Sequence, residues 1–321
     1  MSHQESITSK PLPHSLMRKS PDKVVLVTGA NGLLGQKVVD VFAPHFTVVA
    51  TDLIRESVRP LDNARYHPLD ITDKAAVKDL FTDLEPDILV NCAAYTDVDR
   101  AEEERETAWQ VNAAAVKKMA RLLRRMGTKF VQVSTDYIFD GTDGPYDESA
   151  RPEPVNYYGT SKLAAENELK ASGIDHVIIR TNVLYGAAEQ VSKNFVLWVM
   201  DSLRAGEKIQ VVDDQYNNAT LANGLAECIA IACVMNARGV YHYAGTDLIN
   251  RYEFALKIAQ FFGFNADLIT PCKTEELNQL AARPRKSGLI TDKVVENLSI
   301  QLYDTQAGLQ QVEKDVQQCE I

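Results

Sequence analysis

Two side chains that can move a proton stand four residues apart near the middle of the chain. Tyr158 and Lys162 flank the tripeptide Gly-Thr-Ser, and positions four apart share one face of a helix. A neighbouring ammonium favours the phenolate, so the spacing predicts a pKa for Tyr158 below its ordinary value of about 10. Tyr158 could then pass a proton to or from a carbinol oxygen. An exposed helix face without function would show the same spacing.

A polar run follows the apolar segment 129–133 and contains a second candidate group. It reads Ser134-Thr135-Asp136-Tyr137 and leads into an Asp-Gly pair at 140–141. Ligands of open α/β sheets bind at the carboxyl ends of strands. Thr135 could therefore offer its hydroxyl to the same oxygen as Tyr158. A strand end followed by a turn is the alternative interpretation.

A glycine-rich stretch near the N-terminus could bind a dinucleotide. The apolar residues 24–27 lead into Gly29-Ala-Asn-Gly32-Leu-Leu-Gly35, and a helical apolar pattern follows. Gly29 allows a tight turn, Gly32 lets the backbone approach a pyrophosphate, and Gly35 lets the helix pack closely on the strand. The anion would lie at the helix N-terminus. The predicted contacts are Gly29, Asn31, Gly32, Leu33, Leu34 and Gly35, and Lys162 could hold the nicotinamide ribose. A purely structural turn is the alternative.

The residue that ends the next strand bears on the choice of cofactor. Residues 46–51 read as a strand, and Asp52 follows it. A carboxylate there accepts hydrogen bonds from the adenosine ribose and repels a 2′-phosphate, which favours NAD(H). Arg55 and Arg59 come soon after, so NADP(H) stays open. A turn aspartate is the alternative interpretation of Asp52.

Two further segments could touch the same cofactor. Asp70 and Ile71 follow a short extended run and are placed to flank an adenine, although Asp73 reads as an ordinary helix cap. Small residues after the strand 87–91 let a cofactor lie against the backbone, or serve packing alone. The residues concerned are Ala93, Ala94 and Tyr95.

The order of the elements predicts the fold. Strands over 24–27, 46–51, 87–91, 129–135 and 175–180 alternate with helices, the longest expected over 104–126. This alternation predicts an α/β fold with a Rossmann-like, doubly wound parallel sheet. We expect a disordered tail over 1–22, a cofactor-binding domain over 23–182 and a smaller α/β substrate lobe over 183–321. Residues 220–245 are expected to return to the first domain.

Composition excludes several classes of protein. The chain has 321 residues, a net charge of −10 and no long apolar run, so nucleic acid and membrane are not expected partners. Its five cysteines are odd in number and lack metal-ligand spacing, which indicates reduced thiols and a cytoplasmic location. No metal site is predicted, and a Mg²⁺ requirement is not readable from the sequence.

Taken together, the motifs resemble the extended short-chain dehydrogenase/reductase family and, within it, the dTDP-4-dehydrorhamnose reductase group. The resemblance runs from about residue 23 to 291. Its specific pieces are VTGANGLLG (27–35), NCAAYTDVD (91–99), STDYIFDG (134–141), YYGTSK (157–162), VVDDQ (211–215) and RPRKS (283–287).

The resemblance implies a catalytic trio of Thr135, Tyr158 and Lys162. It implies hydride transfer from NAD(P)H to C4 of a 4-keto-6-deoxyhexose on a nucleoside diphosphate, and it implies a homodimer by analogy. The positions that match substrate contacts in the group are Thr96, Asp136, Tyr137, Asn194, Phe195, Gln215 and Arg283. Without the resemblance, Asn194 reads as a helix cap and Arg283 as part of a surface turn.

Departures from the group pattern keep other functions open. Tyr137 stands where related dehydratases carry a Glu, which argues against water elimination. Val183 replaces a base-stacking Trp, and the pattern after Gln215 also differs, so the base or the sugar could differ. The sequence also resembles the β regulatory subunit of methionine adenosyltransferase, a binding protein. A nucleotide-sugar 4-epimerase is a third alternative.

Overall fold

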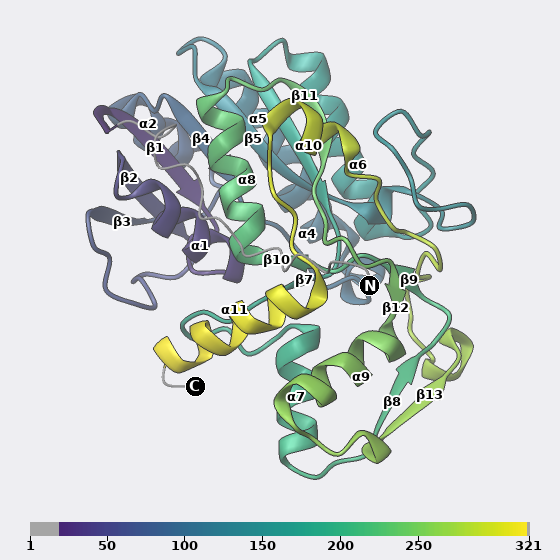
Figure 1. Cartoon of the computed structure of the whole chain (residues 1–321). Coiled ribbons are helices and arrows are strands. Elements are labelled where there is room, and N and C mark those ends of the chain that lie inside the picture. The colour runs from purple at the N-terminus through teal and green to yellow at the C-terminus, as the bar shows by residue number, and fades with distance from the viewer. Residues whose placement is uncertain (1–18, 320–321) are drawn as a thin grey trace.

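The computed structural model describes residues 19–319 and is built on a seven-stranded sheet in which every neighbouring pair is parallel (Figure 1). In spatial order the strands are β11 (Gly239–His242), β6 (His176–Thr181), β5 (Lys129–Thr135), β4 (Ile88–Asn91), β1 (Ser20–Thr28), β2 (Phe46–Asp52) and β3 (Ala64–Pro68). The direction of winding reverses between β1 and β4. The doubly wound parallel sheet predicted from the sequence is confirmed.

Helices cover both faces of this sheet, which explains why its strands are continuous apolar runs. Val25 and Val27 point to one face, which is covered by α1 (Leu33–Phe42), α8 (Ala222–Val234) and α10 (Asp292–Leu298). Leu26 points to the other face, covered by α2 (Lys74–Leu84), α5 (Ala115–Leu123) and α6 (Tyr157–Ser172).

The helix expected over 104–126 is one path with an irregular centre. It consists of α4 (Arg105–Trp109), a π-helical turn (Gln110–Ala114) and α5, and the short α3 (Arg100–Glu103) precedes it. A π turn widens a helix by one residue and is frequent at functional sites. Asn112 lies within this π turn, where its side chain contacts Tyr95 and Ser161.

A smaller lobe lies beside the carboxyl edge of the sheet. Its core is formed by α7 (Phe195–Arg204), α9 (Arg251–Phe262), α11 (Thr305–Gln318) and the parallel pair β8 (Ile209–Val212) with β13 (Ile269–Cys272). Two short pairs join this lobe to the sheet, β7 (Leu184–Tyr185) with β10 (Thr220–Leu221) and β9 (Tyr216–Asn217) with β12 (Ile249–Asn250) (Figure 1). The connections place the lobe next to the ends of β5 and β6.

The first strand and residues 220–245 bear on the expected domain division. β1 begins at Ser20, three residues before the expected start at 23, and the rest of the expected tail, residues 1–18, lies outside the described residues. Between residues 220 and 245, α8 packs against α1 and β11 pairs with β6. No helix in the range 19–319 is long and apolar enough to cross a membrane.

Candidate active site

The glycine loop lies where β1 and β4 part, at the reversal of the winding. Gly29 has a φ of +68°, and a Cβ there would lie 2.6 Å from the amide nitrogen of Ala93. A Cβ on Gly35 would lie 2.1 Å from the Gly29 oxygen, so the helix packs against the loop as predicted. A Cβ on Gly32 would meet only that same oxygen, at 3.3 Å. The loop is thus tight behind Gly29 and Gly35 and open in front of Gly32.

Asp52 and Asn31 hold the loop in this shape. The Asp52 carboxylate accepts from the backbone N–H of Asn31 at 3.0 Å and from that of Leu53 at 2.7 Å. The Asn31 amide bonds to Tyr66 Oη at 3.1 Å and accepts from the Val58 N–H at 3.1 Å. Asn31, a predicted cofactor contact, therefore joins the loop to the segment that follows β2. The exposed Arg55 lies in that segment.

The remaining predicted cofactor contacts are spread along the same edge of the sheet. Asp70 is exposed and accepts from the Thr72 N–H at 2.8 Å, while the side chain of Ile71 is buried in the core, so only its backbone can reach a ligand. Leu33 begins α1 half-buried and Leu34 is buried beneath it. Ala93 and Ala94, half-buried, follow β4.

A residue that sequence reasoning missed joins this edge to the catalytic helix. Asn112, in the π turn, accepts from the Tyr95 N–H at 2.8 Å and donates to the Tyr95 oxygen at 3.1 Å. It also donates to Ser161 Oγ at 2.9 Å. One buried amide therefore fixes the segment after β4 relative to α6. The sequence carries no signal for it, because the π turn is invisible in the apolar pattern.

The three predicted catalytic side chains come together between β5 and α6. Thr135 ends β5, Tyr158 is the second residue of α6, and the two side chains lie beside one another. Lys162, one turn further along, is buried and donates to the Val133 oxygen at 2.7 Å. Helix and strand thus present two hydroxyls to one point and an ammonium behind them.

A buried ion pair fixes α6 on the sheet. Arg180 of β6 donates to both carboxylate oxygens of Glu166, at 2.9 and 2.8 Å, and Ser134 Oγ donates to the same carboxylate at 2.7 Å. Glu166 lies one turn beyond Lys162 on α6, and Ser134 immediately precedes Thr135. Hydrogen bonds to charged groups are the stronger ones, so this contact holds the two catalytic elements in register.

The pKa of Tyr158 is shifted in the direction opposite to the one that the Tyr-x-x-x-Lys spacing predicts. Burial and the neighbouring Asp136 carboxylate raise the pKa of Tyr158, and Lys162 does not lower it. Burial also lowers the pKa of Lys162 to about 8, against the opposing effect of Glu166. The prediction of a depressed Tyr158 pKa is therefore wrong, because burial and the Asp136 carboxylate raise this pKa and Lys162 contributes no opposing shift.

Asp136, predicted to touch substrate, is buried next to Thr135. Its carboxylate is buried, accepts from Thr135 Oγ1 at 3.1 Å and accepts from Ser287 Oγ at 2.6 Å. Burial raises its pKa to about 6. Asp136 thus supports Thr135 from the protein side. Thr96, another predicted contact, is exposed on the segment after β4.

A pocket of about 700 Å³ opens beside Tyr137, whose ring makes an edge contact with Tyr158 at 5.9 Å between centroids. The pocket runs between the lobe and the sheet edge. Five of the predicted substrate contacts line it: Tyr137, Asn194, Phe195, Gln215 and Arg283. Trp198 and Arg251, which sequence reasoning did not single out as site residues, also line it.

Asn194 and Gln215 shape the pocket through contacts of their own. Asn194 caps α7 by accepting from the Leu197 N–H at 3.2 Å, and its amide donates to the Gly186 oxygen at 2.9 Å. Gln215 donates to Thr274 Oγ1 at 3.1 Å. The cap interpretation of Asn194 is correct, and both side chains are engaged within the protein.

Two guanidinium groups face the same pocket. Arg283 pairs with Asp99 at 2.9 Å and donates to the Ala281 oxygen at 2.8 Å. Arg251 lies over the Phe195 ring at 5.0 Å, and no described carboxylate lies within ion-pair distance of it. Burial lowers the pKa of Arg251, while Tyr137 and Asp136 oppose that shift and Arg283 adds to it. The two cations are near neighbours with spare hydrogen-bonding capacity.

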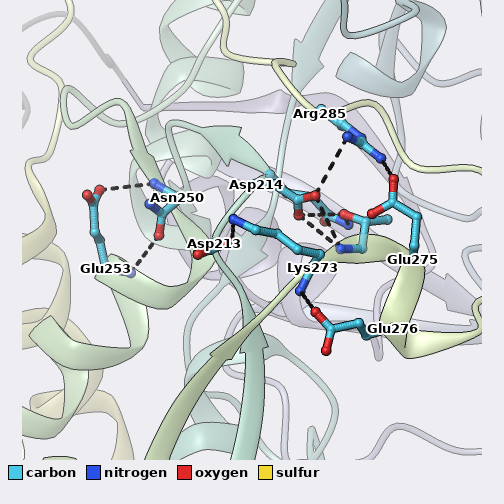
Figure 2. A network of polar contacts seen from close by, with 10 residues as sticks. Asp213, Asp214, Asn250, Glu253, Lys273, Glu275, Glu276 and Arg285 are labelled. Atoms are coloured by element: carbon cyan, nitrogen blue, oxygen red, sulfur yellow. Dashed lines mark hydrogen bonds and ion pairs between the residues drawn. The ribbon is translucent and has the colours of Figure 1, made fainter.

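A network of charged side chains fixes the lobe around these arginines (Figure 2). The capping box of Asn250 and Glu253 starts α9, so that Arg251 is the first helical residue. Lys273 pairs with Asp213 at 2.7 Å, which ties the ends of β8 and β13. Figure 2 also shows Asp214 and Glu275 on either side of Arg285, a contact that anchors the segment leading to Arg283. The Asn-x-x-Glu spacing marks the cap in sequence, but it does not tell that Arg251 faces a pocket.

Comparison with known proteins identifies the family. The RmlD substrate binding domain model matches residues 23–318. A probable low-salt glycan biosynthesis reductase of Haloferax volcanii is 35% identical over 84% of this chain and 90% of its own length. Methionine adenosyltransferase 2 subunit beta of Xenopus laevis is 30% identical over 83% of this chain and 79% of its own.

A solved structure agrees with these matches. The dTDP-4-dehydrorhamnose reductase of Bacillus anthracis, in complex with NADP, superposes with a TM-score of 0.82 at 32% identity, covering 91% of this chain and 99% of that one. The resemblance inferred from the motifs is confirmed. The chain belongs to the RmlD substrate-binding-domain family.

Proposed function

We propose that this protein is an NAD(P)H-dependent reductase of a nucleotide-linked 4-keto-6-deoxysugar, of the dTDP-4-dehydrorhamnose reductase type. The observation that carries the proposal is geometric: the Tyr158 phenol at the start of α6 lies beside Thr135 at the end of β5, with Lys162 one turn further along, and Tyr137 joins this group to a pocket lined by two arginines. Reduction of a keto group needs a proton donor, which Tyr158 supplies, and a diphosphate carrier needs cationic partners, which the two arginines supply. The similarity to the Bacillus anthracis enzyme points to the same reaction.

The residues of the chain perform the acid half of this reduction. Tyr158 is the proton donor, because its phenol, protonated at neutral pH like any tyrosine, lies beside Thr135 and next to the pocket. Thr135 holds the carbonyl oxygen by a hydrogen bond, and the Lys162 ammonium stabilises the phenolate left after proton transfer. When bound, the nicotinamide supplies the hydride for the carbonyl carbon, so hydride and proton together give the alcohol.

The glycine loop is suited to hold that cofactor. The open space before Gly32, at the N-terminus of the ten-residue helix α1, leaves room for a pyrophosphate. Asp52 would accept from the adenosine ribose of NADH, and the exposed Arg55 offers a partner for the 2′-phosphate of NADPH. We therefore propose that both cofactors bind. Arg251 and Arg283 would hold the substrate diphosphate, which suits guanidinium geometry.

The test is the loss of NADH or NADPH absorbance with freshly generated dTDP-4-dehydrorhamnose, beside a control without sugar nucleotide. We expect stoichiometric oxidation in the wild type. Tyr158→Phe should lower kcat by roughly a hundredfold or more while cofactor affinity stays near normal. The matched control is Tyr157→Phe, since Tyr157 contacts Arg105 on the outer side of the helix. Normal turnover in Tyr158→Phe would contradict the proton-donor role.

One finding favours a second function, a binding subunit without turnover. The methionine adenosyltransferase β subunit is about as similar to this chain as the Bacillus anthracis reductase. If the protein binds the cofactor but reduces no sugar nucleotide, the proposal of a regulatory binding subunit replaces the proposal of a reductase. Capture of a methionine adenosyltransferase catalytic subunit by the purified chain would then support it. The homodimer, the cytoplasmic location and the domain division stay predictions.

A further inference from the structure

The pocket is lined by three aromatic side chains, and two of them are already engaged. Tyr137 contacts the ring of Tyr158. Phe195 stacks on Phe254 with 5.5 Å between centroids and 20° between planes, and Arg251 lies over it. The third, Trp198, touches Phe195 at a tilt of 47° and is 42% exposed. Trp198 therefore offers the free aromatic surface of this pocket.

The contacts give the pocket a direction. Tyr158 meets Tyr137, Arg251 lies over Phe195, and Phe195 meets Trp198, while Tyr137 and Arg251 line the same pocket. A ligand whose keto group reaches Tyr158 would thus have its anionic part at Arg251 and Arg283. The portion beyond the anion would arrive at α7, beside Trp198. In a nucleotide-linked sugar, that portion is the nucleoside.

We propose that Trp198 is the surface on which the nucleobase of the substrate stacks. The inference rests on the proposed function and extends it, because it assigns the base end of the pocket to α7. Stacking of a base on an aromatic ring is worth roughly 1–3 kcal/mol and tolerates any base. Asp201, three residues after Trp198 on α7, and Gln210 also line the pocket and can bond to the edge of the base.

The environment of Trp198 argues against a packing role. A Trp that serves the core is usually buried with its N–H bonded. Trp198 keeps much of its surface open, and its indole N–H has no acceptor among residues 19–319. Trp109, the other tryptophan, is 40% exposed on α4 and does not line this pocket. Trp109 is therefore a matched control.

The experiment measures binding of dTDP, UDP, GDP and ADP, with inorganic pyrophosphate as the ligand without a base, by calorimetry on the full chain. Trp198→Ala should weaken binding of the preferred nucleoside diphosphate about tenfold or more. Pyrophosphate affinity should not change. Trp198→Phe keeps an aromatic face and should stay within about threefold of the wild type. In Trp109→Phe, where Trp198 is the remaining indole, the nucleotide should quench fluorescence.

Each result decides between stacking and another role. Equal affinity in Trp198→Ala and wild type overturns the proposal, as does equal loss of nucleotide and pyrophosphate binding. Failure of the wild type to bind any of the four nucleotides also overturns it. If Trp198→Ala loses base-dependent binding and the wild type reduces no sugar nucleotide, the stacking role of Trp198 is supported and the reductase proposal is contradicted. The two proposals therefore fail separately.

Discussion

Asp136 is a carboxyl group with almost no exposed surface, placed directly behind the two catalytic hydroxyls. Its neighbours Ser287 and Thr135 donate to it, but burial dominates and raises its pKa to about 6. The folded chain thus binds this proton more tightly than the unfolded chain. Between pH 3.8 and about 6 the folded state holds more protons, so the free energy of unfolding falls as pH rises through that window.

Asp136→Asn should remove this loss. We expect the free energy of unfolding at neutral pH to rise by up to roughly 3 kcal/mol and its dependence on pH to flatten in that window. Urea denaturation of both proteins at several pH values measures it. The control is Asp140→Asn, since hydrogen bonds from Tyr146 and Thr142 lower the pKa of Asp140. That change should destabilise instead, and a stabilised Asp140→Asn or an unchanged Asp136→Asn would contradict the account.

At the scale of single residues, the sequence singled out candidate catalytic residues but did not predict the direction of their pKa shifts. The Tyr-x-x-x-Lys spacing predicts Tyr158 and Lys162 because it is local. Their pKa values depend on burial by segments distant in sequence, which no spacing reveals. Arg251 was missed for the same reason: its neighbours Phe195 and Tyr137 lie far from it along the chain.

At the scale of elements, the turn between β1 and α1 separates two uses of glycine. Gly35 lacks space for any side chain, whereas Gly32, with a φ of −73°, has an ordinary backbone and open space ahead. One position therefore serves packing and the other leaves room for a ligand.

Gly35→Ala and Gly32→Ala should accordingly fail in different ways. The added methyl at Gly35 meets backbone at 2.1 Å and should lower the free energy of unfolding by about 1–3 kcal/mol. The methyl at Gly32 should leave thermal stability near that of the wild type. It should nevertheless weaken NADH and NADPH binding by about tenfold or more, as measured by nucleotide fluorescence. Normal cofactor binding by a stable Gly32→Ala protein would contradict the assignment of this space to the pyrophosphate.

Elements with strong local signals were predicted well, and those stabilised by distant contacts were not. The signals of α9 are local, because the capping box of Asn250 and Glu253 starts the helix and Gly263 ends it. β3 is an edge strand with few buried side chains, so its sequence was read only as a short extended run. α11 was missed. It docks on α1 through the ion pair of Lys37 and Asp315, and that contact has no local signature.

At the scale of the whole molecule, Asp99 joins the cofactor half to the lobe. It follows β4, yet it accepts from the Ala281 N–H at 2.9 Å and pairs with Arg283. Burial would raise the pKa of Asp99, but these two contacts outweigh burial and lower it. Asn156 adds a bond to the Ala282 oxygen at 2.9 Å. Three consecutive residues of the lobe are thus held at the rim of the pocket.

Asp99→Ala should weaken dTDP binding roughly tenfold, because Arg283 and its segment lose their anchor. NADH affinity should not change, since the glycine loop does not depend on this contact. Calorimetry with each ligand measures both. The control is Asp97→Ala, whose carboxylate accepts from the Arg100 N–H within the same segment. If Asp99→Ala lowered the affinity for dTDP and for NADH equally, or if Asp97→Ala lowered the dTDP affinity as much as Asp99→Ala, Asp99 would not be the anchor of Arg283.

The position of α8 has a consequence for how the protein folds during its synthesis on the ribosome. The face of the sheet that carries α1 is completed by Leu225, Ile229 and other residues of α8. When residues 23–182 have emerged, the apolar side chains of that face still lack their cover, and exposed apolar surface in such intermediates promotes aggregation. Parallel strands also pair slowly across long separations. The nascent cofactor half therefore stays incomplete until α8, which follows α7 and β8 of the lobe in the sequence, has been synthesised.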